Sequence, residues 1–334
     1  MSGRFAKFVS AAAFATLLVA GSHPAAAQGK KLVVAVPGVP PIFASVIAFV
    51  ADKEGLFKKY GATVEVRPFD NGTAAARAVI AGDIDMALSP TPPVINQASN
   101  SGAPFVAVYG MPNPDWVLGS TEAGKTCKDI AGQSVGVDSI GGARSIALRS
   151  MLVGCPGVKI DQVQQVALGS NTAPAMIAGQ LKFGVLHLDD LAVMQVQGKP
   201  VHTLLAMKNT NPTSHYLLWV VRKDKLAANR DAIVRAVAGL IAAARFMNDP
   251  KNADKVAEIA TVTGHKKDVA AAALKQFLAI DFWATKDDGM DKTKINAVSA
   301  LMKKIGSVTA GKQAVTYDQL VDPSVWKDAN AMVK

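Results

Sequence analysis

The chain has 334 residues, half of them hydrophobic, and its 36 Lys and Arg against 26 Asp and Glu give a formal charge of +10. This composition excludes a disordered chain, a collagen and a small disulfide scaffold, because these need low hydrophobicity, a Gly repeat or many more Cys. At about 150 residues per domain, the length predicts two domains. The basic residues are scattered along the chain, so the charge indicates solubility, with some attraction for anionic ligands, rather than nucleic-acid binding.

Residues 1–27 have the pattern of a secretory leader. Arg4 and Lys7 form the basic start, residues 8–20 the apolar stretch, and three Ala at 25–27 the cleavage site. An uncleaved anchor would need about 20 apolar residues, more than this stretch offers. We therefore expect cleavage after Ala27 and a periplasmic mature protein.

The mature chain keeps two cysteines, Cys127 and Cys155. In an oxidising compartment an isolated pair of Cys is more often a disulfide than a metal or catalytic site. We predict a disulfide between them, with two free buried thiols as the alternative.

From residue 31 onward, short β-branched runs alternate with helical patterns. The first half predicts strands at 31–36, 63–69, 84–88 and 105–109, with helices at 43–54, 73–80 and 93–101. After a Pro-containing stretch at 111–115, strands follow at 116–119, 134–137, 164–168, 183–188 and 201–206, with helices at 143–153, 173–179 and 190–197. Such alternation is typical of βαβ crossovers and parallel sheets, so the fold class is α/β with two similar halves.

The last third begins with a strand at 216–221 and then shows only helical patterns, at 231–248, 252–263 and 266–280. We expect these helices to return to the first lobe, with 116–119 and 216–221 as two strands that cross between the lobes. Lobe 1 then comprises 28–117 and 218–334, and lobe 2 comprises 118–217. Two doubly wound sheets joined in this way form a hinged clamp around a cleft.

Ligands of open parallel sheets bind where the strands end and the helices begin. This rule selects the loops after five predicted strands as candidate binding sites. The candidate ligand-binding residues in these loops are Pro40, Phe43, Asn71, Ser89, Thr91, Ser139, Gly141, Gly142, His187 and Asp189.

The turn from Ser139 to Gly142 is the clearest of these loops. A hydroxyl and two Gly at a helix start expose backbone N–H groups, which suit a carboxylate, sulfonate or phosphate, and Arg144 would add charge. The alternative is an ordinary helix cap. Phe43 in the first loop predicts an apolar cleft wall, or alternatively a residue of the lobe core.

Metal and enzyme motifs are weak. The histidines at 187, 202, 215 and 265 lack metal-ligand spacings, so we expect neither a metal site nor a cofactor. The turn at 137–141 approaches a nucleophile elbow, but Val137 stands where the elbow needs a small residue. Ser139, Asp189 and His202 occur in the order of a hydrolase triad, so an exported hydrolase using Ser139 is the alternative to a binding protein.

Several motifs together resemble a known family. They are KEGLFKKYG at 53–61, AGDIDMA at 81–87, DIAGQSVGV at 129–137 and AGQ at 178–180. In this order they resemble the nitrate/sulfonate/taurine and hydroxymethylpyrimidine group of periplasmic solute-binding proteins of ABC transporters. The resemblance implies the two-lobed type II periplasmic binding fold, no enzymatic activity, and a membrane permease and ATPase as partners. We also expect a monomer that binds no nucleic acid.

One departure from the family pattern bears on the ligand. After AGQ the family has a hydrophobic residue and then Asp, whereas here Leu181 is followed by Lys182, and the strand ends at His187, Asp189 and Asp190. The family's sulfonate or taurine specificity is therefore not carried over. We expect a small solute with donor and acceptor groups, either an organic anion such as a sulfonate or carboxylate, or a small heterocycle.

Overall fold

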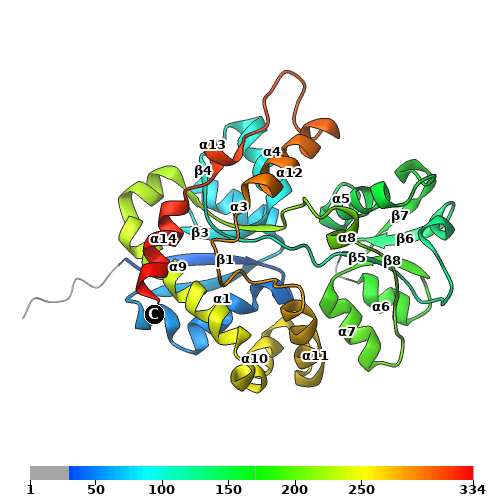
Figure 1. Cartoon of the computed structure of the whole chain (residues 1–334), viewed down its shortest axis with the longest axis horizontal. Helices are drawn as coiled ribbons and strands as arrows, with labels where there is room; N and C mark the ends of the chain where they lie inside the picture. The colour runs from blue at the N-terminus through cyan, green and yellow to red at the C-terminus, as the bar shows by residue number, and fades with distance from the viewer. Residues whose placement is uncertain (1–29, 170, 334) are drawn as a thin grey trace, which may run out of the picture.

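The computed structural model describes residues 30–169 and 171–333, which form two lobes side by side, each built on a five-stranded sheet (Figure 1). The predicted leader, residues 1–27, lies outside the described residues. Among the helices that are described, none is long and apolar enough to cross a membrane.

The sheet of the first lobe has the strand order β2-β1-β3-β10-β4. Its strands are β1 (Leu32–Pro37), β2 (Val64–Phe69), β3 (Met86–Pro90), β4 (Phe105–Met111) and β10 (Leu217–Arg222). Strands β1, β2 and β3 are parallel as predicted, but β10 is antiparallel to both of its neighbours. The sheet is therefore mixed, because β10 enters from the second lobe without a helical crossover.

The sheet of the second lobe repeats this plan in the order β7-β6-β8-β5-β9. Its strands are β5 (Val117–Ser120), β6 (Ser134–Val137), β7 (Gln164–Ala167), β8 (Phe183–Leu186) and β9 (His202–Ala206), and its helices are α5 (Ala143–Met151), α6 (Thr172–Ile177), α7 (Leu188–Val196) and α8 (Met207–Thr210). Here β5 is the antiparallel strand, between β8 and β9.

The first lobe carries the remaining helices. They are α1 (Val46–Lys53), α2 (Leu56–Lys59), α3 (Gly72–Ala81), α4 (Thr91–Ser101), α9 (Lys223–Asn248), α10 (Ala253–Ala260), α11 (Lys267–Leu278), α12 (Lys292–Lys304), α13 (Tyr317–Leu320) and α14 (Pro323–Met332). As predicted, C-terminal helices pack on the first lobe: α9 and α14 contact β4, and α12 contacts α4. In addition, α11 contacts α7 of the second lobe (Figure 1).

The two predicted crossing strands each belong to one sheet. β5 starts at Val117 in the second sheet and β10 at Leu217 in the first, close to the predicted lobe boundaries. The chain crosses between the lobes just before them, at residues 112–116 and again, after α8, at residues 211–216. Trp116 and Tyr216 end these two segments, so both lie at the boundary between the lobes.

Each lobe has one contact that stabilises it from within. Phe43, in a short 3-10 helix (Phe43–Ser45), is buried and stacks on Phe277 with ring centroids 4.9 Å apart, so it belongs to the core of the first lobe. This is the alternative reading of Phe43, and it corrects the expectation of a cleft wall. In the second lobe the predicted disulfide between Cys127 and Cys155 is confirmed, with their Cα atoms 6.0 Å apart.

Candidate functional site

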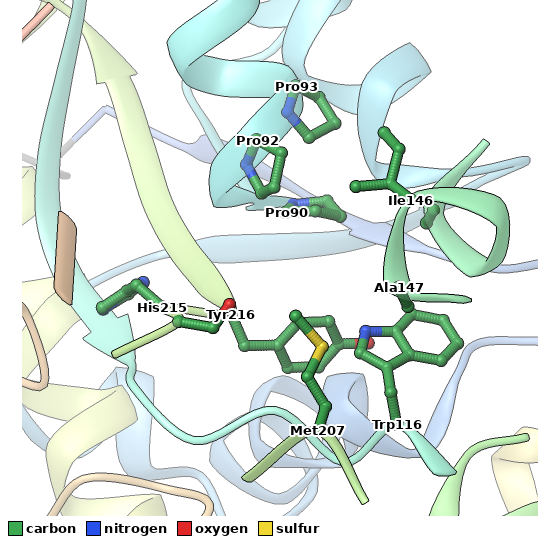
Figure 2. Close-up of a pocket in the computed structure, with 11 residues that line it drawn as sticks. Pro90, Pro92, Pro93, Trp116, Ile146, Ala147, Met207, His215 and Tyr216 are labelled. Carbon is green, nitrogen blue, oxygen red and sulfur yellow. The ribbon is translucent and has the colours of Figure 1, made fainter. Parts of the chain in front are cut away.

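A pocket lies between the two lobes (Figure 2). The cavity itself has a volume of about 30 Å³, and the gap around it is open to solvent. Its lining comes from both lobes and both crossing segments and consists of Pro90, Pro92, Pro93, Trp116, Ala143, Ile146, Ala147, Met207, Ser214, His215 and Tyr216.

Local sequence explains how this lining is placed. Pro92 and Pro93 lie in the first turn of α4, where proline is tolerated because the N–H groups of that turn have no partner within the helix. Across the pocket from them lie the rings of Trp116 and Tyr216, edge to face with centroids 5.7 Å apart (Figure 2). Both aromatic residues are at most 6% exposed. The pocket therefore has rigid apolar walls on opposite sides.

His215 fixes one end of the pocket through two hydrogen bonds. Its Nε2 lies 2.7 Å from the Gly289 carbonyl oxygen, so this nitrogen donates, and its Nδ1 lies 2.8 Å from the Thr91 hydroxyl, which donates in turn. Burial lowers the pKa of His215 to about 4. His215 is thus a neutral imidazole at physiological pH.

Behind Trp116 lies a group of charged side chains that we call the interlobe cluster. Its members are Asp115, Arg144, His187, Asp189, Asp190 and His265. The His187 ring lies against the Trp116 ring in a tilted arrangement, with centroids 3.7 Å apart, and its Nδ1 donates to Asp115 Oδ2 at 2.7 Å. Burial alone would lower the pKa of His187, but the Asp115 carboxylate outweighs it and raises the pKa.

A second contact of the cluster joins the lobes. His265, which precedes α11 in the first lobe, donates from Nε2 to Asp189 Oδ2 in α7 at 3.2 Å. Burial opposes charge on both groups, yet the pairing raises the pKa of His265 and lowers the pKa of Asp189. The contact therefore joins the lobes, and it becomes an ion pair when His265 is protonated.

Arg144 is fully engaged inside the second lobe. It is 6% exposed and donates to the Val185 carbonyl at 3.0 Å and to Asp190 Oδ2 at 3.1 Å. The guanidinium also lies 5.9 Å from the centroid of the Trp116 ring. It is therefore not free to bind a solute anion, as the sequence suggested it could be.

The predicted anion-binding turn is filled by the protein itself. Asp138 Oδ1 accepts the N–H groups of Ser139 at 2.8 Å and Arg144 at 3.1 Å. A Cβ at Gly142 would clash with Ser139 Oγ and lie 2.7 Å from Asp138 Oδ1, so the absence of a side chain lets this carboxylate approach. The turn therefore acts as a helix cap, which was the alternative interpretation, but the capping side chain is Asp138 rather than Ser139.

The other predicted residues are distributed as follows. Asn71 is an exposed N-cap of α3 and accepts the Ala74 N–H at 2.9 Å. Ser89 is fully buried, and its hydroxyl has no hydrogen-bond partner among the described residues. Pro40 is exposed, and a Cβ on the neighbouring Gly264 would lie 3.3 Å from its Cγ.

None of the ten predicted ligand-binding residues is among the eleven that line the pocket. Thr91 and His187 contact the lining residues His215 and Trp116, and Ser89 and Gly142 directly precede the lining residues Pro90 and Ala143. The sequence reasoning missed Trp116 and Tyr216 as pocket residues, although it placed both at the crossing segments. Aromatic residues at a predicted hinge were the available signal.

The alternative hydrolase site is not assembled in the described part of the chain. Asp189 pairs with His265 rather than His202. His202 is exposed on β9, and no hydrogen bond joins the Ser139 hydroxyl to a histidine within the described residues.

The chain belongs to the NMT1/THI5-like family, whose profile matches residues 43–253. This confirms the family prediction. A binding protein of Brucella abortus is 23% identical over 217 residues, which are 64% of this chain and 67% of that protein.

Solved structures share the fold. The ligand-binding component of an ABC-type import system from Staphylococcus aureus, with zinc bound, superimposes with a TM-score of 0.70 at 17% identity, over 90% of this chain and 99% of that one. The periplasmic aliphatic sulphonate-binding protein SsuA of Escherichia coli gives 0.69 at 19% identity, over 88% and 92%. The fold is therefore the periplasmic-binding-protein fold that the sequence predicted.

Proposed function

We propose that this protein is the exported solute-binding component of an ABC import system, whose two lobes present a small solute to a membrane permease and its ATPase. The family, the two-lobed fold and the pocket between the lobes support this role. The import system of the Staphylococcus aureus protein and the periplasmic location of SsuA support the partners and the compartment. The predicted leader supports export.

Of the two expected ligand classes, the pocket favours a small neutral heterocycle over an organic anion. The observation that carries this proposal is the lining itself, in which two aromatic residues, Met207 and three prolines surround the space and no Lys or Arg is present. The features that suggested an anion, Arg144 and the turn before α5, already have internal carboxylate partners.

A ring bound here would act on the hinge directly. Trp116 and Tyr216 each end a crossing segment, so a ring that contacts both aromatic side chains also contacts both lobe connections. Aromatic pairs of this kind contribute about 0.5–1.5 kcal/mol beyond burial. The solute then favours the closed arrangement by its differential contacts with the two lobes, and no covalent step is needed.

A calorimetric and thermal-shift screen of the exported chain tests the proposal. The panel pairs neutral six-membered heterocycles, such as pyrimidines with amino or hydroxymethyl groups, with benzoate, benzenesulfonate and nitrate. A bound solute at 100 times its Kd should stabilise the protein by about 2.7 kcal/mol. Trp116→Ala should weaken binding, Trp116→Phe should keep most of it, and Trp326→Phe in α14 is the control.

The outcomes separate the two parts of the proposal. Binding of benzenesulfonate or nitrate with no binding of heterocycles would overturn the ligand class and leave the receptor role standing. A solute that is consumed rather than recovered unchanged would overturn the receptor role itself.

A further inference from the structure

Part of the interlobe cluster has the composition of a metal site. Asp115, His187 and Asp189 each offer a ligand atom, and these atoms all lie within 4.8 Å of one another. His265 Nε2 lies 3.2 Å from Asp189 Oδ2 but outside this group of three, so it would supply a fourth ligand after a movement of its side chain. We propose that these four side chains bind one divalent transition-metal cation of the zinc class, beside the solute pocket. The proposal goes beyond solute binding and does not depend on the identity of the solute.

The spacing of the donors suits such an ion. Four-coordinate zinc with bonds of 2.0–2.2 Å to nitrogen and oxygen places neighbouring ligand atoms about 3.3 Å apart. The pairs already present measure 2.7 Å, between His187 Nδ1 and Asp115 Oδ2, and 3.2 Å, between His265 and Asp189. Asp115, His187 and Asp189 would therefore need only small side-chain shifts, whereas His265 would have to move closer to the other ligands. Two imidazoles with two carboxylates favour zinc, cobalt or nickel over calcium and magnesium, which prefer oxygen ligands.

An unsatisfied atom in the cluster points to a missing partner. Asp115 is 4% exposed, and its Oδ1 has no hydrogen-bond partner among the described residues. Burial raises the pKa of Tyr216, and the neighbouring Asp115 carboxylate raises it further through its charge and a side-chain hydrogen bond, although Oδ1 of Asp115 accepts no hydrogen bond of good geometry. A buried charged oxygen without a partner is costly. A cation bound by both oxygens of Asp115 would remove that cost, because Oδ1 would then have a partner.

The charge of the cluster is also suited to a divalent ion. Metal-binding imidazoles are neutral, which leaves the carboxylates of Asp115, Asp189 and Asp190 against the single guanidinium of Arg144. One divalent cation balances the remaining two negative charges. Arg144 does not compete with the metal for the ligands, because its hydrogen bonds go to Asp190 and the Val185 carbonyl.

The four ligands come from different parts of the fold. His187 and Asp189 follow β8 in the second lobe, His265 precedes α11 in the first, and Asp115 lies on a crossing segment. A metal bound by all four would hold the two lobes in this arrangement. It would also fix His187, whose ring contacts Trp116 in the pocket wall.

Titration of the metal-stripped exported chain with Zn²⁺ and Co²⁺ tests the site. We expect one equivalent to bind, with the visible absorption of four-coordinate Co²⁺ and a higher melting temperature with Zn²⁺. His187→Gln and His265→Gln should each reduce affinity by more than the 10- to 100-fold that loss of an outer-shell partner costs. His202→Gln, at an exposed histidine on β9, is the matched control and should bind as wild type.

Three results would overturn the site. They are no stoichiometric binding by the wild-type chain, equal affinity in the wild type and both histidine variants, or a loss in His202→Gln as large as in His265→Gln. If His187→Gln does not fold, Asp115→Asn, which keeps the side-chain shape, replaces it and should lose Co²⁺ absorption. The solute screen is repeated with chelator, so failure of the metal site and failure of the receptor role are read separately.

Discussion

The two lobes share one sheet plan but differ in how they are stabilised. In the first lobe all seven residues of β4 are buried, and the C-terminal helices cover the sheet. One edge strand in each lobe, β2 or β7, has no buried residue, but the other edge strand of the second lobe, β9, has only one. The second lobe contains the disulfide, which supplies stability that its smaller core does not. Similar topology therefore does not mean similar sources of stability.

The two walls of the pocket differ in a related way. The first lobe contributes Pro90, Pro92 and Pro93, a rigid wall without charge. In the second lobe, Asp138 in the turn before α5 accepts a hydrogen bond from the first turn of that helix, and Asp189 and Asp190 lie in the first turn of α7, where Asp190 pairs with Arg144. The first wall is thus held by backbone stiffness and the second by buried charge pairs. Substitutions that remove one stabilising interaction at a time test this difference between the two walls.

The largest effect is expected from Arg144→Met. The change keeps most of the side-chain volume but leaves Asp190 without its guanidinium partner in a place where both side chains are at most 14% exposed. Breaking such a pair from one side costs about 3–5 kcal/mol. Chemical denaturation measures this loss in the free energy of unfolding.

The double variant Arg144→Met with Asp190→Leu is the control for Arg144→Met. Removing both charges should restore part of the stability, because no unpaired charge remains. If the Asp190→Leu change lowers the free energy of unfolding further instead of restoring part of it, the Arg144–Asp190 pair does not stabilise this wall of the pocket.

The disulfide should contribute nearly as much, and only to the second lobe. Cys127 and Cys155 are 28 positions apart, and closing a loop of this length is worth about 3.5 kcal/mol in the chain-entropy model. Cys127→Ser with Cys155→Ser should lower the melting temperature by roughly 10 °C. Reductant should destabilise the wild type similarly and leave the double variant unchanged; an equal response of both would contradict the assignment.

Acid should act on the first wall through His215. Its pKa is lowered to about 4 from 6.5, so between these values the unfolded chain binds a proton that the folded chain does not. Stability from this group is complete above pH 6.5 and falls as the pH drops toward 4, by on the order of 3 kcal/mol. Urea unfolding at several pH values measures it.

His187 and His265 have raised pKa values and act in the opposite direction, so they must be separated from His215. Their stabilisation is present at low pH and is lost as the pH rises through their folded-state pKa values. The difference between the wild type and His215→Gln isolates the effect of His215. A constant difference between pH 4 and 7 would refute the assignment.

Most of the fold could be predicted because its strands and helices follow from local sequence patterns. Apolar runs and helical periodicity located nearly every strand and helix as far as residue 280, and the two cysteines located the disulfide. The direction of β5 and β10 could not be predicted this way. Their orientation depends on how the chain enters each sheet from the other lobe, which is a property of tertiary structure.

The site was harder to predict because its contacts join residues far apart in sequence. His187 pairs with Asp115 across 72 positions and Asp189 with His265 across 76. A search for closely spaced metal ligands therefore predicted no metal site, and nothing local marked Asp115 or His265. The rule that ligands bind where strands end and helices begin selected the starts of α4 and α5, which do line the pocket. It could not show that the Asp138 carboxylate would already bind the N–H groups at the start of α5.

The smallest effects separate the helix caps of the two lobes. Asn71 caps α3 in the first lobe, and Asp138 caps α5 in the second. Each change to Ala should cost about 1 kcal/mol, measured by thermal unfolding. Only Asp138→Ala should also gain affinity for an anion such as benzenesulfonate, because it frees N–H groups at the start of a helix beside the pocket. Equal anion affinity in the two variants would mean that Asp138 is not what excludes anions from this wall.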